Sequence, residues 1–258
     1  MLLSELLKSI PHRLVNGDAE INGIEYDSRK GIEKGMLFCC IVGTALDGHD
    51  FAQTAYESGA AALLVERELD IPIPQAVVEN GRIAMATVAS NFYGNPANAF
   101  PIVGVTGTNG KTSVTYMVKE IAESFGKKVG VIGTIKNTIG DEVLFTSSRT
   151  TPESVMLQAT LRKMADSGVD LVVMEVSSSA LDQYRVYGID FTVAAFTNLT
   201  IDHLDYHKTF ENYRDAKKKL FYSCKHAVIN KDDASADERM RGSPCDCITV
   251  GISKEADI

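Results

Sequence analysis

The 258-residue sequence lacks long hydrophobic runs, a cleavable leader pattern and a paired set of cysteines. No segment reaches the roughly 20 apolar residues that a membrane-spanning helix needs, so membrane insertion is not expected. The opening residues, MLLSELLKSIPHRL, contain no long apolar core, which argues against a secretory signal. The five cysteines are odd in number and lack a second pair at zinc spacing, so we expect reduced thiols in a cytoplasmic protein.

The sequence also lacks an excess of basic residues. It has 26 Lys and Arg against 34 Asp and Glu, for a formal net charge of −8. A chain of this charge with no dense basic stripe is a poor partner for nucleic acid or for an anionic membrane surface. A phosphate ligand remains compatible with this charge, because backbone N–H groups and one or two cations can bind it locally.

What the sequence does contain is an alternation of apolar runs with segments of helical period, which predicts an α/β fold with mostly parallel strands. The hydrophobic content of 45% is enough for two domains. A turn-forming stretch, GNPAN at 94–98, separates a small first domain, 1–97, from a second, 98–258. In the first domain we expect strands at 36–42, 61–65 and 75–78, and helices at 50–58 and 82–92.

The second domain is expected to continue the alternation. We expect strands at 101–105, 128–132, 171–174, 191–196, 227–230 and 248–252, and helices at 112–125, from 150 onward, and at 210–222. A T-x-x-E pattern with an early proline at 150–153 predicts the start of the second of these helices. Helical spacing predicts two buried stripes, one formed by Val114, Met117, Val118, Ile121 and Phe125, the other by Leu157, Leu161 and Met164.

The strongest local signal is the segment GVTGTNGKT at 104–112, between a buried strand and a helix. Its glycines let backbone N–H groups face phosphate oxygens, and the helix N-terminus adds partial positive charge. The spacing departs from the strict Walker pattern because Gly104 comes one residue early, so an ordinary strand-to-helix turn is the alternative. The expected ATP contacts are Gly107, Thr108, Asn109, Gly110, Lys111 and Thr112, with the Thr112 hydroxyl also on Mg²⁺.

Polar residues follow two further strands. Glu175 ends an apolar strand, and parallel strands place ligands at their carboxyl ends, so this carboxylate suits an Mg²⁺ ion on the phosphates. Its alternative is a solvated strand-end glutamate. His203 follows the strand at 191–196 and is a candidate second metal ligand, although a loop histidine is more often structural or exposed.

The helix at 210–222 contains three consecutive lysines, and only Lys217 lies on its apolar stripe. One interpretation is a side chain that reaches out to water along its aliphatic stem. The other is a functional lysine whose charge is paired or altered.

Four segments together resemble the Mur ligase family, most closely its MurE type: TGTNGKT, MEVSSSALDQYRV, FTNLTIDHLDYH and YRDAKKKLF. The resemblance covers nearly the whole chain. It implies that Glu175 and His203 bind Mg²⁺ and that Lys217 carries a CO₂-derived carbamate, which makes it an anionic metal ligand. The family commonly has a histidine where this chain has Ser179, which puts any contact of that side chain in doubt.

The same resemblance extends to a precursor-binding side. The segment YDSR at 26–29 and the loop GTALDG at 43–48 resemble the UDP-binding part of the family's first domain, which implies a contact from Ser28 and leaves one near Thr44 uncertain. The implied contacts to the muramoyl peptide are Thr150, Thr151, Ser177, Gln183 and Arg185. The two threonines also fit as helix caps. Arg185 suits a substrate carboxylate because its planar fork binds bidentately, the alternative being a surface arginine.

The activity that the resemblance implies is ATP-dependent and Mg²⁺-requiring amide ligation. A diamino acid, meso-diaminopimelate or L-lysine, would be joined to UDP-MurNAc-L-Ala-D-Glu through an acyl phosphate, by a monomeric enzyme of peptidoglycan precursor synthesis. Nothing in the 258 residues resembles the family's C-terminal domain, and the central domain looks incomplete. A non-catalytic module that binds precursor or nucleotide is therefore a second hypothesis, and a folate-polyglutamate ligase is a third.

Overall fold

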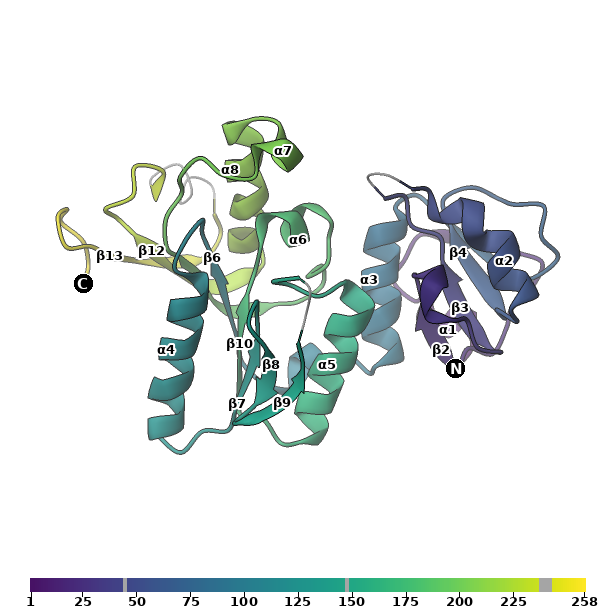
Figure 1. Ribbon diagram of the computed structural model, residues 1–258, viewed down its shortest axis with the longest axis horizontal. Coiled ribbons are helices and arrows are strands. Elements are labelled where there is room, and N and C mark those ends of the chain that lie inside the picture. Colours follow the sequence, from purple (N-terminus) through teal and green to yellow (C-terminus); the bar gives the residue numbers. More distant parts are fainter. Residues whose placement is uncertain (44–45, 147–148, 237–242) are drawn as a thin grey trace. The chain divides into compact units, whose positions relative to one another are not determined.

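A computed structural model describes residues 1–43, 46–146, 149–236 and 243–258. The chain divides into two compact units, Met1–Asn95 and Pro96–Ile258, each with its own sheet (Figure 1). Within the described residues no helix is long and apolar enough to cross a membrane. All five cysteines are free thiols.

The first unit is built on a five-stranded sheet in the order β1-β5-β4-β3-β2. All pairs are parallel except β1 with β5. The hydrophobic pattern predicted the three central strands, while the short outer strands β1 and β2 were missed. The elements are β1 (His12–Val15), β2 (Gly23–Glu25), β3 (Met36–Cys39), β4 (Ala62–Val65), β5 (Gln75–Val78), α1 (Leu3–Leu6), α2 (Ala52–Glu57) and α3 (Gly81–Phe92).

The second unit holds an eight-stranded sheet in the order β13-β12-β11-β6-β10-β7-β8-β9. Its strands pair in parallel except at the β7-β8-β9 edge, so the expected α/β class with a mostly parallel sheet is confirmed. The strands are β6 (Ile102–Thr106), β7 (Val129–Ile132), β8 (Asn137–Ile139), β9 (Glu142–Phe145), β10 (Leu171–Glu175), β11 (Phe191–Phe196), β12 (Cys224–Asn230) and β13 (Asp246–Val250).

Helices lie on both faces of this second sheet. One face packs against α4 (Lys111–Ser124), which contacts β6, β7 and β10. The other face forms a larger core, in which Leu157 and Leu161 of α5 (Ser154–Asp166) join Tyr213 and Leu220 from the region of α8 (Phe210–Lys218). The short helices α6 (Ser178–Asp182) and α7 (Leu204–His207) complete this unit near the carboxyl ends of the strands (Figure 1).

Two sequence predictions about helices are wrong. Of the stripe expected on α4, only Val114 and Val118 pack against the sheet, and Met117, Ile121 and Phe125 are 62%, 61% and 80% exposed. The helix α5 begins at Ser154 with Glu153 as its N-cap, not at the T-x-x-E pattern. The Thr150 hydroxyl accepts from the Thr134 hydroxyl, and the Thr151 hydroxyl donates to the Glu175 carbonyl, so both bond outside the helix.

A close approach between two central strands depends on Gly104 of β6. A Cβ atom added there would lie 2.7 Å from Cδ1 of Phe191, which is fully buried on β11. We therefore expect Gly104→Ala to destabilise the fold by about 1–3 kcal/mol through overpacking. Urea unfolding should show that Gly104→Ala lowers the unfolding free energy by less in a Phe191→Leu background, because the two residues share one contact. Additive effects in the double variant would contradict this account.

Candidate functional site

The glycine-rich loop between β6 and α4 is shaped by its backbone. Gly107 has a φ of +151°, and Gly110 has a φ of +83° as the N-cap of α4. Any side chain at Gly107 would collide with the Thr197 hydroxyl, 1.9 Å from the position of the added Cβ. The loop leads directly into α4 at Lys111, so its N–H groups and the helix N-terminus lie together, as a phosphate site requires.

The segment after β11 holds this loop in place. The Thr197 hydroxyl donates to the Asn109 carbonyl at 2.6 Å, and the Asn109 N–H donates to the Asn198 side-chain oxygen at 3.0 Å. The Thr108 N–H donates to the Asn198 carbonyl at 2.8 Å. The carboxyl ends of β6 and β11, which are neighbours in the sheet, therefore form one rigid rim.

Glu175 lies at the end of β10, and only 1% of the residue is exposed. Its carboxylate accepts from the Thr112 hydroxyl at 3.0 Å and from the N–H and hydroxyl of Thr134 at 2.9 and 3.1 Å. The interpretation as a solvated strand-end glutamate is therefore wrong. The sequence did not single out Thr134, because nothing but its place after β7 distinguishes it.

Lys217 is also buried, with 2% of the residue exposed. Its Nζ donates to the Gly107 carbonyl at 2.8 Å. The ammonium also lies 4.6 Å from the centre of the Tyr213 ring. Tyr213 in turn bonds to the Thr108 hydroxyl at 3.0 Å. The predicted inward orientation is confirmed, and the reading in which the side chain reaches out to water is wrong. One helical face of α8 thus contacts the loop twice.

The precursor side predicted from the resemblance also gathers around strand ends. The Thr151 hydroxyl donates to the Glu175 carbonyl at 2.9 Å and accepts from the Ser177 N–H at 3.0 Å. Arg185 is 5% exposed, so the surface-arginine alternative is wrong. Its guanidinium donates to the Thr151 carbonyl at 3.1 Å and to the Gln183 side-chain oxygen at 2.7 Å.

One buried carboxylate joins two arginines at this side. Glu153 lies 3.0 Å from Nε of Arg185 and accepts from Nη1 of Arg149 at 2.8 Å. The two arginines carry two positive charges and Glu153 carries one negative charge, so the cluster keeps one net positive charge. Sequence analysis missed Arg149, whose only signal is its place directly before the two threonines.

Two further residues of the segment IDHLDYH were also missed. The Tyr206 hydroxyl accepts from the Gln183 amide at 3.0 Å and donates to Asp182 at 3.1 Å. His207 is buried and its Nε2 lies 2.9 Å from the Ser178 hydroxyl. Both residues link α7 to α6. The motif IDHLDYH contains them, but only His203 was predicted from it.

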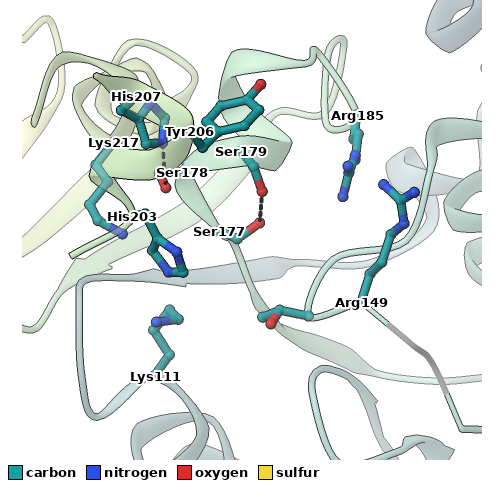
Figure 2. Close-up of a pocket in the computed structure, with 11 residues that line it drawn as sticks. Lys111, Arg149, Ser177, Ser178, Ser179, Arg185, His203, Tyr206, His207 and Lys217 are labelled. Carbon is teal, nitrogen blue, oxygen red and sulfur yellow. Dashed lines mark hydrogen bonds between the residues drawn. The ribbon is translucent and has the colours of Figure 1, made fainter. Parts of the chain in front are cut away.

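One pocket of about 350 Å³ is lined by charged and polar side chains of these segments (Figure 2). Lys111, Lys217, Arg149 and Arg185 bring four cationic side chains to it, and the described lining includes no aspartate or glutamate. In a chain of net charge −8 this is a local reversal of sign, which favours an anionic ligand. The remaining lining is Thr150, Ser177, Ser178, Ser179, His203, Tyr206 and His207.

Burial shifts the pKa of two groups in this pocket. It lowers the pKa of Lys111, although the charges of Glu175 and Asp202 oppose the shift. Burial also lowers the pKa of His207. The Asp182 charge opposes this shift, and the nearby Lys217 cation acts in the same direction as burial. His207 therefore favours its neutral form, which can act as hydrogen-bond donor or acceptor to Ser178.

Within the second unit, the structure brings the predicted site residues together at the strand ends. Ser28 lies in the first unit, in a turn capped by Asp27, and Thr44 lies outside the described residues. His203 lines the pocket with 58% of its side chain exposed and a φ of +52°. No group of three His, Cys, Asp or Glu side chains within the described ranges is arranged to hold a metal ion.

Two family models match the chain. The Mur ligase family, catalytic domain, matches residues 20–98, and the Mur ligase middle domain matches residues 105–258. The UDP-N-acetylmuramoyl-L-alanyl-D-glutamate–2,6-diaminopimelate ligase of Bacillus velezensis is 48% identical over 93% of this chain and 51% of its own length. The ligase of the same name from Listeria monocytogenes is 46% identical over all of this chain and 54% of its own.

Solved structures agree with these matches. One of a diaminopimelate ligase with the same name has a TM-score of 0.79 at 32% identity and covers 92% of this chain and 50% of its own. A folylpolyglutamate synthase from Mycobacterium tuberculosis shares only the fold, with a TM-score of 0.53 at 17% identity. The chain spans about half the length of the curated relatives it matches. Both its units and its phosphate loop thus have counterparts in one group of ligases, and the chain belongs to the Mur ligase family.

Proposed function

We propose that this chain provides the nucleotide and precursor sites of an ATP-dependent ligase that joins a diamino acid to UDP-MurNAc-L-Ala-D-Glu. The observation that carries the proposal is the cationic pocket, in which the phosphate-loop lysine and two arginines, Arg149 and Arg185, line the same cavity. Glu153 pairs with both arginines from behind the lining. A triphosphate and a free carboxylate are the two anions that such a pair of subsites would hold side by side. The relatives' names supply the specific substrates.

The proposed reaction is the one that the family resemblance implies, and the pocket residues take the following roles in it. The D-glutamate side-chain carboxylate attacks the γ-phosphorus of ATP, the bond to ADP breaks, and an acyl phosphate forms. The amine of the diamino acid then displaces phosphate. Lys111 stabilises charge on the transferring phosphoryl group, and the loop N–H groups fix its position. Arg185, held by Thr151, Gln183 and Glu153, orients the carboxylate instead of moving freely toward it.

The residues present fit an Mg²⁺ ion at the phosphates. Thr112 and Glu175 offer hydroxyl and carboxylate oxygens 3.0 Å apart at the loop, and oxygen is the donor that Mg²⁺ prefers. His203 and a carbamate on Lys217 would supply a second set of ligands. The bound metal would neutralise phosphate charge. An unmodified ammonium cannot serve as a ligand, so this second set depends on the modification. A carbamate keeps one N–H on Nζ of Lys217, which can still donate to the Gly107 carbonyl.

One rival function needs only the binding residues. A module that binds nucleotide and precursor without turnover would use the same pocket. Titration calorimetry of the 258-residue chain with each ligand should show saturable binding of both. A coupled ADP-release assay with Mg²⁺, precursor and each diamino acid separates the two functions, since release only in the complete mixture marks the ligase. Saturable binding without release would favour the module, and no binding of either ligand would refute both.

Lys111→Ala should weaken ATP binding by at least about tenfold, since it removes the only loop cation near the phosphates, while precursor binding should change little. A tenfold loss corresponds to about 1.4 kcal/mol. Calorimetry measures both affinities. Lys119→Ala is the matched control, because Lys119 lies two turns along the same helix and pairs with Glu123. Equal losses in the two variants would contradict the role given to Lys111.

Lys217→Ala should remove a bicarbonate-derived carbamate signal in carbon-13 NMR and abolish any turnover, which added bicarbonate should not restore. Lys218→Ala is the control, because the neighbouring Lys218 faces the Tyr222 ring instead of the loop. A carbamate signal that persists in Lys217→Ala would remove this residue from the proposed site.

Tyr206→Phe should weaken precursor binding about fivefold and leave ATP binding unchanged. The lost hydroxyl accepts from Gln183, so the amide that faces Arg185 would no longer be fixed, at a cost of about 1 kcal/mol. Calorimetry with each ligand tests this, and Tyr187→Phe, on a 45% exposed tyrosine, serves as control. Parallel losses for ATP and precursor would instead indicate a general structural effect.

A further inference from the structure

The threonine that follows β7 lies between the two sides of the site. The hydroxyl oxygen of Thr134 is 3.1 Å from Oε2 of Glu175 and 3.0 Å from the hydroxyl oxygen of Thr150, and it is placed to donate to either. Glu175 belongs to the phosphate side through its bond with Thr112, whereas Thr150 lines the pocket together with the two arginines. The described lining does not include Thr134, so any influence of its hydroxyl on a bound anion passes through these two neighbours.

The Thr134 hydroxyl has one proton and two acceptors within reach, so it cannot donate fully to both at once. The carboxylate is the stronger acceptor, because hydrogen bonds to an ionised group are shorter and stronger than those between neutral groups. In the free protein the proton therefore favours Glu175, and the Thr150 hydroxyl is left without this donor.

Other groups keep Glu175 in place whichever way this proton points. The Thr134 N–H donates to Oε1 of Glu175 at 2.9 Å, and the Thr112 hydroxyl donates to Oε2 at 3.0 Å. A side chain at Gly133 would collide with Oε1, so the carboxylate lies directly against the main chain. Loss of the Thr134 hydroxyl alone would leave Glu175 with two donors, and the hydroxyl is not required to hold the carboxylate.

A second link between the same two sides lacks this choice of acceptor. The Thr151 hydroxyl donates to the main-chain carbonyl of Glu175 at 2.9 Å and not to its carboxylate. A ligand that engages the carboxylate leaves that carbonyl unchanged, so this bond stabilises the strand end in the free and the bound protein alike. Thr134, by contrast, contacts the carboxylate oxygen itself.

We propose that Thr134 is a positioning residue that couples nucleotide binding to precursor binding through the direction of its hydroxyl proton. When Oε2 of Glu175 is shared with a cation at the phosphates, the Thr134 proton turns to Thr150. The Thr150 oxygen accepts this bond, and its own proton is then available to an anionic group of the precursor. Because such coupling is reciprocal, each ligand raises the affinity for the other by the same factor. The inference rests on the proposed function and concerns how its two sites act on each other.

The test compares Thr134→Val, which keeps the shape of the side chain without the hydroxyl, with Thr134→Ser, which keeps the hydroxyl. Calorimetry with Mg²⁺ measures the affinity of the 258-residue chain for UDP-MurNAc-L-Ala-D-Glu, first alone and then with saturating β,γ-methylene ATP, which prevents phosphoryl transfer. In the unsubstituted chain the nucleotide should tighten precursor binding at least about threefold, within the range that one hydrogen bond provides. Thr134→Val should lower this factor at least about threefold, and Thr134→Ser should retain it.

The affinities for single ligands separate a link between the sites from a support of the fold. In Thr134→Val the affinity for either ligand alone should change less than about twofold, because Glu175 keeps its other two donors. A loss of the same size with and without nucleotide would overturn the proposal, since Thr134 would then only support the site. Equal coupling in the unsubstituted chain and Thr134→Val, or lost coupling in Thr134→Ser, would also overturn it. Binding of both ligands without coupling refutes this inference alone, whereas binding of neither refutes the proposed function with it.

Discussion

The contact between the Lys217 ammonium and the Gly107 carbonyl is the constraint on which the arrangement of the site depends. A lysine at 2% exposure is costly to bury unless its charge is paired or hydrogen-bonded. Here the compensating acceptor is the phosphate loop itself, 110 residues earlier in the chain. The same contact that satisfies the ammonium therefore fixes α8 against the loop, and the Tyr213 ring and hydroxyl reinforce it.

The carboxyl ends of the neighbouring strands β6, β10 and β11 bring the rest of the site to this point. Their parallel pairing aligns the loop, Glu175 and the Thr197 segment at one edge of the sheet. Glu175 is held by Thr112 on one side and by Thr134 on the other, while its own carbonyl receives the Thr151 hydroxyl. A short path of hydrogen bonds thus connects the phosphate side with the residues around Arg185. The proposed phosphorylation of a carboxylate by ATP would need the carboxylate and the triphosphate held at a fixed separation.

Charge is also distributed unevenly over the chain. The chain as a whole is acidic, yet four cationic side chains line a pocket whose described lining has no carboxylate. Glu153 lies behind that lining and keeps two arginines in place without cancelling both charges.

The sequence by itself determined the class of fold, the central strands and the phosphate loop, because these depend on local signals: apolar runs, glycines that permit unusual backbone angles, and a lysine on an apolar helical stripe. The tertiary structure alone decided the partners of those residues. Thr151 was predicted as a helix cap, but its hydroxyl bonds to strand β10, and Met117, Ile121 and Phe125 were predicted as core but are exposed. Arg149 and Thr134 had no local signal beyond their place in the chain, and the signal for Tyr206 was only the motif IDHLDYH. In each case the deciding contact joins segments far apart in the chain, and periodicity reports which face of an element is apolar but not what lies opposite that face.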